Sequence, residues 1–167
     1  MIPQFQVNQT VIHKREGIAN IVSTASISGK QYYLLKAARG DGETIYVPGD
    51  SSENIIRPIM DESQAEEILK YMSSVKKEYT SNTKQRRDFY KRLLNSGDTQ
   101  DIAFLSMQLR IYNTTEHDIE NDEMRLGVMD IDLLSKADNI LMDELALTYN
   151  KDRDKIKDFV FEKIETL

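Results

Sequence analysis

The hydrophobic pattern of this chain changes its period once, at Arg57-Pro58. Before this point, apolar and β-branched residues gather in short runs between glycine- and proline-containing turns, which is typical of strands. After it, apolar residues recur every three or four positions, as on one face of a helix. The pattern predicts an α+β protein with a strand-rich domain over residues 1–60 and an all-helical domain over residues 61–167.

The strand-rich part predicts five short strands, at residues 11–13, 18–23, 32–38, 44–47 and 54–56. Turn sequences separate them, namely Ser28-Gly29-Lys30, Gly40-Asp41-Gly42 and Pro48-Gly49. Strands this short, packed into so few residues, favour a small and strongly bent β-barrel over an open sheet.

The helical part predicts a first helix that begins at a capping box made by Ser63 and Glu66. A second helix spans about residues 83–95 and ends at Gly97, which suits a left-handed position after a helix. Asp98 is predicted to cap the start of a third helix.

Two apolar stripes mark the third helix, at residues 102, 105, 109 and 112 and at residues 104, 107 and 111. A helix that is apolar on two sides is expected at the centre of its bundle. Helical spacing resumes over residues 133–148, and Asn150 is predicted to cap a last helix. Residues 113–123 read as an acidic loop between the third and fourth helices.

Charge is distributed unevenly along the chain. The whole chain has a formal net charge of −6. Residues 70–92 nevertheless hold eight basic residues against two acidic ones. Lys84, Arg87 and Lys91 share one face of the predicted second helix, whereas Arg86 falls on its apolar side. Both a solvated helix face and a local anion-binding surface fit this pattern.

Few residues in this sequence suit catalysis. The chain has no cysteine, which excludes disulfides, thiolate metal sites and a cysteine nucleophile. His13 and His117 lie in different domains, and neither stands in a nucleophile-and-base arrangement. Gly40 and Gly42 precede a strand rather than a helix, so they do not form a phosphate loop. We therefore expect neither an enzyme nor a cofactor.

The sequence also indicates a cytoplasmic protein without a membrane partner. No apolar run approaches the roughly 20 residues that span a bilayer. The opening residues 1–4 show no basic segment followed by an apolar one, so no secretion signal is expected.

Five sequence segments, in order along both domains, resemble the CarD/CdnL family of bacterial transcription regulators. The first is FQVNQTVIHKREGIANI at residues 5–21, which resembles the opening of the family. The others are ISGKQYYLLK at 27–36, TIYVP at 44–48, NSGD at 95–98 and DELAL at 143–147. The resemblance covers essentially the whole chain.

This resemblance implies a Tudor-like barrel that binds the β subunit of RNA polymerase by adding a strand edge to it. The strand Thr44, Ile45, Tyr46 and Val47 is the candidate for this contact. The resemblance also implies that the helical domain contacts promoter DNA and stabilises the open complex. Basic groups are needed for phosphates, so the candidate DNA contacts are Lys84, Arg87, Lys91 and Arg86. With few basic groups on an acidic chain, DNA binding should be weak and non-specific.

The sequence departs from the family at several positions. Two polymerase-facing arginines of well-known members align with Ala25 and Tyr46. Many members carry a tryptophan that enters the minor groove; this chain has none, and the equivalent position is near Thr83. The direction of regulation, activating or inhibiting, is left open.

Two alternatives from other classes remain. One is a Tudor-like peptide-binding adaptor without DNA contact, which would need an aromatic cage. Tyr32, Tyr33 and Tyr46 alternate between the two faces of the sheet, so they cannot all line one cage. The other is a metal-dependent enzyme that uses the acidic residues 116–123, although these lack the glycine turn and spacing of a calcium loop.

Overall fold

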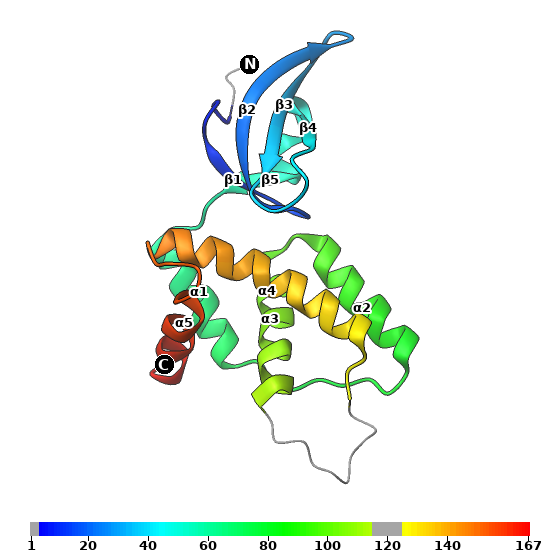
Figure 1. Cartoon of the computed structure of the whole chain (residues 1–167), viewed down its shortest axis with the longest axis vertical. Coiled ribbons are helices and arrows are strands. Elements are labelled where there is room, and N and C mark those ends of the chain that lie inside the picture. Colours follow the sequence, from blue (N-terminus) through cyan, green and yellow to red (C-terminus); the bar gives the residue numbers. More distant parts are fainter. Residues whose placement is uncertain (1–3, 115–124) are drawn as a thin grey trace. The chain divides into compact units, whose positions relative to one another are not determined.

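The computed structural model describes residues 4–114 and 125–167. The chain divides into two compact units, Met1–Met60 and Asp61–Leu167. The first contains a five-stranded antiparallel sheet and the second is helical (Figure 1). This arrangement confirms the predicted α+β class. Within the described residues, no helix is long and apolar enough to cross a membrane.

The sheet of the first unit has the strand order β4-β3-β2-β1-β5. Its strands are β1 (Thr10–His13), β2 (Gly17–Ile27), β3 (Lys30–Ala37), β4 (Thr44–Pro48) and β5 (Ile56–Pro58). The strands are strongly bent, most visibly β2 (Figure 1). The sheet is therefore barrel-like but unclosed, and β4 and β5 form its two ends.

Two strand predictions need correction. β2 continues to Ile27 rather than ending at Ser23, because it keeps pairing with β3 beyond an irregularity between Ile21 and Ser23. The polar residues of this extension hide its strand character in the sequence. Residues Gly49–Asn54 form a short 3₁₀ helix, η1, so the fifth strand lies later than predicted, where Arg57 pairs with Ile12.

The core of the sheet unit is apolar. Phe5 packs edge to face against Tyr33, with ring centroids 5.9 Å apart. The buried cluster consists of Phe5, Val11, Ala19, Ile21, Tyr33, Leu35, Val47 and Ile56. His13 is buried nearby, and its Nδ1 accepts hydrogen bonds from the N–H groups of Arg15 and Glu16, at 3.1 and 3.2 Å. Burial lowers the pKa of His13, so its neutral form fits this turn.

The helical unit contains five helices: α1 (Glu62–Ser73), α2 (Thr83–Ser96), α3 (Thr99–Thr114), α4 (Val128–Thr148) and α5 (Ile156–Glu165). α3 packs against α1, α2 and α4, and eight of its residues are buried, which confirms its predicted central position. α4 crosses α3 (Figure 1). Gly97 ends α2 with a φ of 68°, as predicted.

Local sequence signals misplaced three helix boundaries. The capping box at α1 is made by Asp61 and Gln64, which exchange backbone-to-side-chain hydrogen bonds of 2.8 and 2.9 Å. Asn150 adopts a left-handed conformation after α4 rather than capping α5, which begins only at Ile156. α4 begins at Val128, earlier than predicted.

Candidate functional site: a sheet edge and a basic helix

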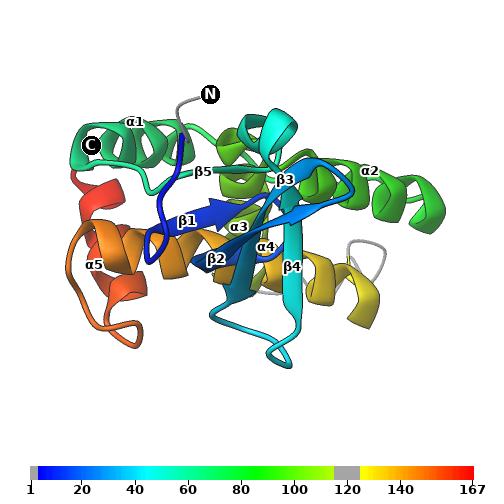
Figure 2. The same ribbon diagram turned by 90° about the horizontal axis from the view of Figure 1, so that it is seen from above.

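β4, the strand predicted to bind polymerase, lies at one end of the sheet. Figure 2 shows β4 among the strands of the sheet. It pairs with β3 in the register Leu34↔Tyr46 and Leu35↔Ile45. Among the described residues, it has a strand partner on this side only. The other side of its backbone therefore provides N–H and C=O groups that an added strand can pair with.

The side chains of β4 alternate between the core and the solvent. Tyr46 is 54% exposed and Thr44 is exposed, whereas Val47 is fully buried and Ile45 packs against the core. Of the four predicted residues, only Thr44 and Tyr46 therefore present their side chains outward. Val47 can take part in an interface through its backbone, since its side chain lies in the core.

Tyr46 belongs to a small aromatic surface on the outer face of the sheet. Its ring lies edge to face with that of Tyr32, with centroids 6.5 Å apart. Tyr33 points the other way and is buried, and its hydroxyl accepts a hydrogen bond from the N–H of Phe5 at 3.3 Å. Because the two outward rings contact each other and the third is in the core, these tyrosines do not form an aromatic cage.

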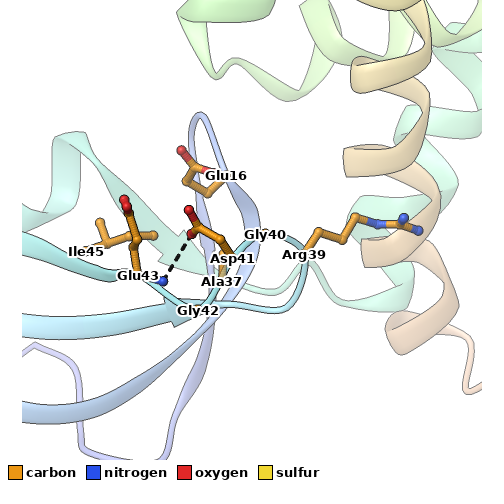
Figure 3. Close-up of a pocket in the computed structure, with 8 residues that line it drawn as sticks. All are labelled: Glu16, Ala37, Arg39, Gly40, Asp41, Gly42, Glu43 and Ile45. Atoms are coloured by element: carbon orange, nitrogen blue, oxygen red, sulfur yellow. Dashed lines mark hydrogen bonds between the residues drawn. The ribbon is translucent and has the colours of Figure 1, made fainter.

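The loop that leads into β4 forms a pocket of about 380 Å³. Figure 3 shows the residues that line this pocket. Among them, the Oδ1 of Asp41 accepts a hydrogen bond from the N–H of Glu43 at 3.2 Å. The carboxylates of Glu16, Asp41 and Glu43 line it together, and the Arg39 side chain extends away from them. Three carboxylates so close together repel an anion such as phosphate.

The basic residues of α2 fall into two groups that differ in burial. Lys84 and Lys91 are exposed, and the Arg87 side chain is 32% exposed. Arg86, in contrast, is 4% exposed. Its position follows from the helical spacing, which places Arg86 beside the buried Tyr90.

Arg86 is held by a buried ion pair with Asp130 of α4. Its Nη2 and Nε donate to the Oδ2 of Asp130 at 2.8 and 3.1 Å, and its Nη1 donates to the carbonyl of Thr80 at 2.7 Å. The ring of Tyr79 lies 5.0 Å from the guanidinium. Arg86 is therefore removed from the predicted DNA contacts, because its donors are engaged inside the domain.

Sequence reasoning did not find the main role of Asp130 in this region. At the start of α4, its Oδ2 accepts a hydrogen bond from the N–H of Gly127 at 2.9 Å. Asp130 also forms the buried ion pair with Arg86, and its Oδ1 lies 3.8 Å from the Nε of Arg87. Burial, and then the charge of Asp130, raise the pKa of Tyr90 to about 12, so this phenol stays neutral.

The acidic loop falls mostly outside what the structure describes. Asn113 and Thr114 belong to α3 rather than to a loop. Residues 115–123, with His117 and most of the predicted loop, lie outside the described residues. Among the described residues, no group of histidine and acidic side chains is arranged to hold a metal ion.

A barrel-like unit with an exposed strand edge, followed by a helical domain with a basic helix face, defines a two-domain binding protein. Residues 5–60 match the family model of the CarD-like/TRCF RID domain, and residues 67–161 match that of the CarD C-terminal domain. The chain belongs to the CarD-like family, whose members are regulators of transcription that interact with RNA polymerase. No curated protein matches this chain.

Proposed function

We propose that this protein binds the β subunit of RNA polymerase through the β4 edge and contacts promoter DNA through α2, and so modulates open-complex stability. The observation that carries the proposal is the position of β4 at the end of the sheet, with Tyr46 exposed on it.

The polymerase contact is a strand addition. A strand of the β subunit pairs with the outer backbone of β4, and Thr44 and Tyr46 contact its side chains. Tyrosine is enriched in interfaces because it combines a large apolar area with a polar group. The ring of Tyr32 lies edge to face with that of Tyr46 and enlarges the aromatic surface available to the added strand.

The DNA contact uses Lys84, Arg87 and Lys91. Their spacing places them on one helix face, where they can neutralise phosphates without reading sequence. The net charge of −6 opposes association with DNA, so the free protein binds weakly and without sequence preference. Binding to polymerase raises the local concentration of DNA around the domain and makes this weak contact effective.

Calorimetry of the full-length protein with the isolated β lobe tests the polymerase contact. Tyr46→Asp places a charge in the interface and should weaken binding about tenfold or more. Val7→Asp is the matched control, since Val7 is 46% exposed in the same unit but lies outside β4. No binding of the wild-type protein to the β lobe would remove the central claim, and equal effects of the two substitutions would remove the β4 assignment.

A further inference from the structure

The segment that connects α1 to α2 has no helix or strand, yet side chains of α3 hold its backbone (Figure 1). The carboxamide of Gln108 accepts a hydrogen bond from the N–H of Glu78 at 3.0 Å and donates one to the carbonyl of Lys76 at 2.7 Å. The hydroxyl of Tyr112 donates to the carbonyl of Glu78 at 2.8 Å. These two side chains therefore pair with the segment in the way that a neighbouring strand would.

Both side chains are buried, so these hydrogen bonds are costly to break. Gln108 is 0% exposed and Tyr112 is 9% exposed. A buried amide that loses its partners does not regain them from water, so Gln108 is restricted to this arrangement. Burial raises the pKa of Tyr112, so its hydroxyl keeps the proton that it donates. The rings of Tyr79 and Tyr112 lie 6.3 Å apart and add an aromatic contact between the segment and α3.

The same segment leads directly into α2, which also binds it. Arg86 of α2 donates a hydrogen bond to the carbonyl of Thr80 at 2.7 Å, and its guanidinium lies 5.0 Å from the ring of Tyr79. Two residues after Thr80, Asn82 caps α2 by accepting a hydrogen bond from the N–H of Gln85 at 3.0 Å. The path of the segment therefore determines where α2 begins.

α2 depends on these polar contacts because its apolar packing is small. Among the residues of α2, all of which the structure describes, Arg86 and Tyr90 are buried, whereas α3 buries eight residues. Phe89 adds an edge-to-face contact with Phe104, with ring centroids 6.0 Å apart. An element with few buried apolar contacts moves at low cost in free energy unless its end is fixed.

We propose that Gln108 is a positioning residue for α2. It lies in the core of the helical unit and acts through residues 76–80, which set the start of α2 and its rotation about its own axis. This inference rests on the proposed DNA contact of α2. Without Gln108, α2 occupies several orientations, and Lys84 and Lys91 face the DNA together in a fraction of them. The apparent affinity for DNA falls by that fraction.

Distances between spin labels in the full-length protein test whether Gln108 positions α2. The chain has no cysteine, so labels attach only at introduced cysteines. Asp88→Cys/Lys136→Cys reports the distance between α2 and α4, and Glu67→Cys/Lys136→Cys reports the distance between α1 and α4; all three positions are exposed. Adding Gln108→Leu should broaden the distance distribution of the first pair and leave that of the second unchanged.

The affinity of the unlabelled variant for a DNA duplex at low salt gives the functional result. Gln108→Leu should weaken duplex binding about three- to tenfold, which corresponds to a binding orientation occupied a third to a tenth of the time. The measurement is fluorescence anisotropy at a temperature where circular dichroism shows the variant to be folded. If Gln108→Leu does not fold, Tyr112→Phe replaces it, because this variant removes the hydroxyl that Glu78 accepts and keeps the ring. It should produce the same changes to a smaller extent.

Ser106→Ala is the matched control. Ser106 lies on the same helix at 0% exposure and donates a hydrogen bond to the Oδ1 of Asp138 at 2.9 Å. Its loss removes a buried hydrogen bond of α3 without touching residues 76–80. This variant should be less stable than the wild type, but both distance distributions and the duplex affinity of the folded protein should be unchanged.

The distances and the affinities separate this inference from the proposed function. An unchanged distance distribution between α2 and α4 in the variant that folds, or an equal broadening in Ser106→Ala, overturns the positioning role of Gln108. A broadened distribution with weakened duplex binding supports both. A broadened distribution with unchanged duplex binding supports the positioning of α2 by Gln108 and overturns the DNA contact of α2.

Discussion

The two units of this protein differ in how many charged and polar side chains they bury. The sheet unit buries an apolar cluster, and its buried polar residues are His13 and Ser52. The helical unit buries several ionisable or polar side chains, namely Arg86, Ser106, Gln108, Asp130, Asp138 and Glu144. The proposed binding surfaces follow the same division, since one uses backbone and tyrosine and the other uses cations.

This difference shows that one helix, α2, can both stabilise its domain and present a charged surface. α2 directs Arg86 inward to Asp130 and directs Lys84 and Lys91 outward. The buried Arg86–Asp130 ion pair fixes the orientation of α2 and so the positions of Lys84 and Lys91. In the sheet unit, the Tyr46 surface depends on strand pairing and apolar packing, so changes in charge should affect it little.

The strongest test of this contrast removes the charge of Asp130. Asp130→Asn leaves Arg86 buried without its counter-charge, which should lower the free energy of unfolding of the helical unit by about 3–5 kcal/mol. Urea unfolding followed by helical circular dichroism measures this loss. Asp132→Asn is the control, because Asp132 is exposed on the same helix and should cost under about 0.5 kcal/mol. Similar losses in both variants would show that the buried pair contributes little.

The sheet unit should lose stability in mild acid through His13. Its pKa is lowered in the folded state, so the unfolded chain takes up a proton first as the pH falls. The stability contributed by neutral His13 is complete above about pH 6.5, the unfolded value. It falls by up to about 1.4 kcal/mol per pH unit below that, until the folded pKa is reached.

His13→Asn tests this origin, because an asparagine Oδ1 can accept the turn N–H groups without titrating. Urea unfolding at several pH values, followed by the NMR signals of buried sheet residues such as Ile21 and Leu35, reports on the sheet unit. The wild type should weaken between pH 6.5 and 5, whereas the variant should show a flatter profile. An equally steep profile in the variant would assign the acid sensitivity to other groups.

Salt should separate the two proposed interfaces. With three phosphate contacts from Lys84, Arg87 and Lys91, the log–log salt slope for DNA should be about −3. Binding of the β lobe through β4 should show a slope near zero, because neutral groups form that contact. Both slopes can be measured by anisotropy over one salt series.

Lys84→Gln/Lys91→Gln should reduce the DNA slope by about two units and leave β-lobe binding unchanged. Glutamine is used because both positions are exposed, and Arg87 is kept because its pair with Asp130 would confound the result. An unchanged DNA slope would show that this helix face is merely solvated.

Sequence patterns predicted those features whose causes are local. The C-terminal end of α2 follows from Gly97, and the inward position of Arg86 follows from helical spacing. The start of α4 was missed because its first turn exposes apolar residues and buries Asp130, the reverse of the usual pattern. The partner of Asp130 lies 44 residues away, and neither its identity nor its distance leaves a local signal.

The position of β4 at the sheet edge also could not be predicted from a local sequence pattern. The strand at Thr44–Val47 was predicted from its composition, and its proposed role came from resemblance to a family. Its place at the end of the sheet depends on the order in which five strands pair, which no single segment encodes.

The smallest expected effect concerns Thr83, which lies near the position predicted by spacing for the family's tryptophan. Thr83 is exposed at the first turn of α2, and its side chain is too small and polar to separate stacked bases. Thr83→Ala should change open-complex lifetime by less than about twofold, corresponding to the roughly 0.5 kcal/mol typical of surface substitutions. The measurement is open-complex lifetime on one promoter, with Lys84→Gln/Lys91→Gln as the variant expected to respond. If Thr83→Ala shortens the lifetime as much as the lysine variant does, α2 meets the DNA fork through its N-terminal end.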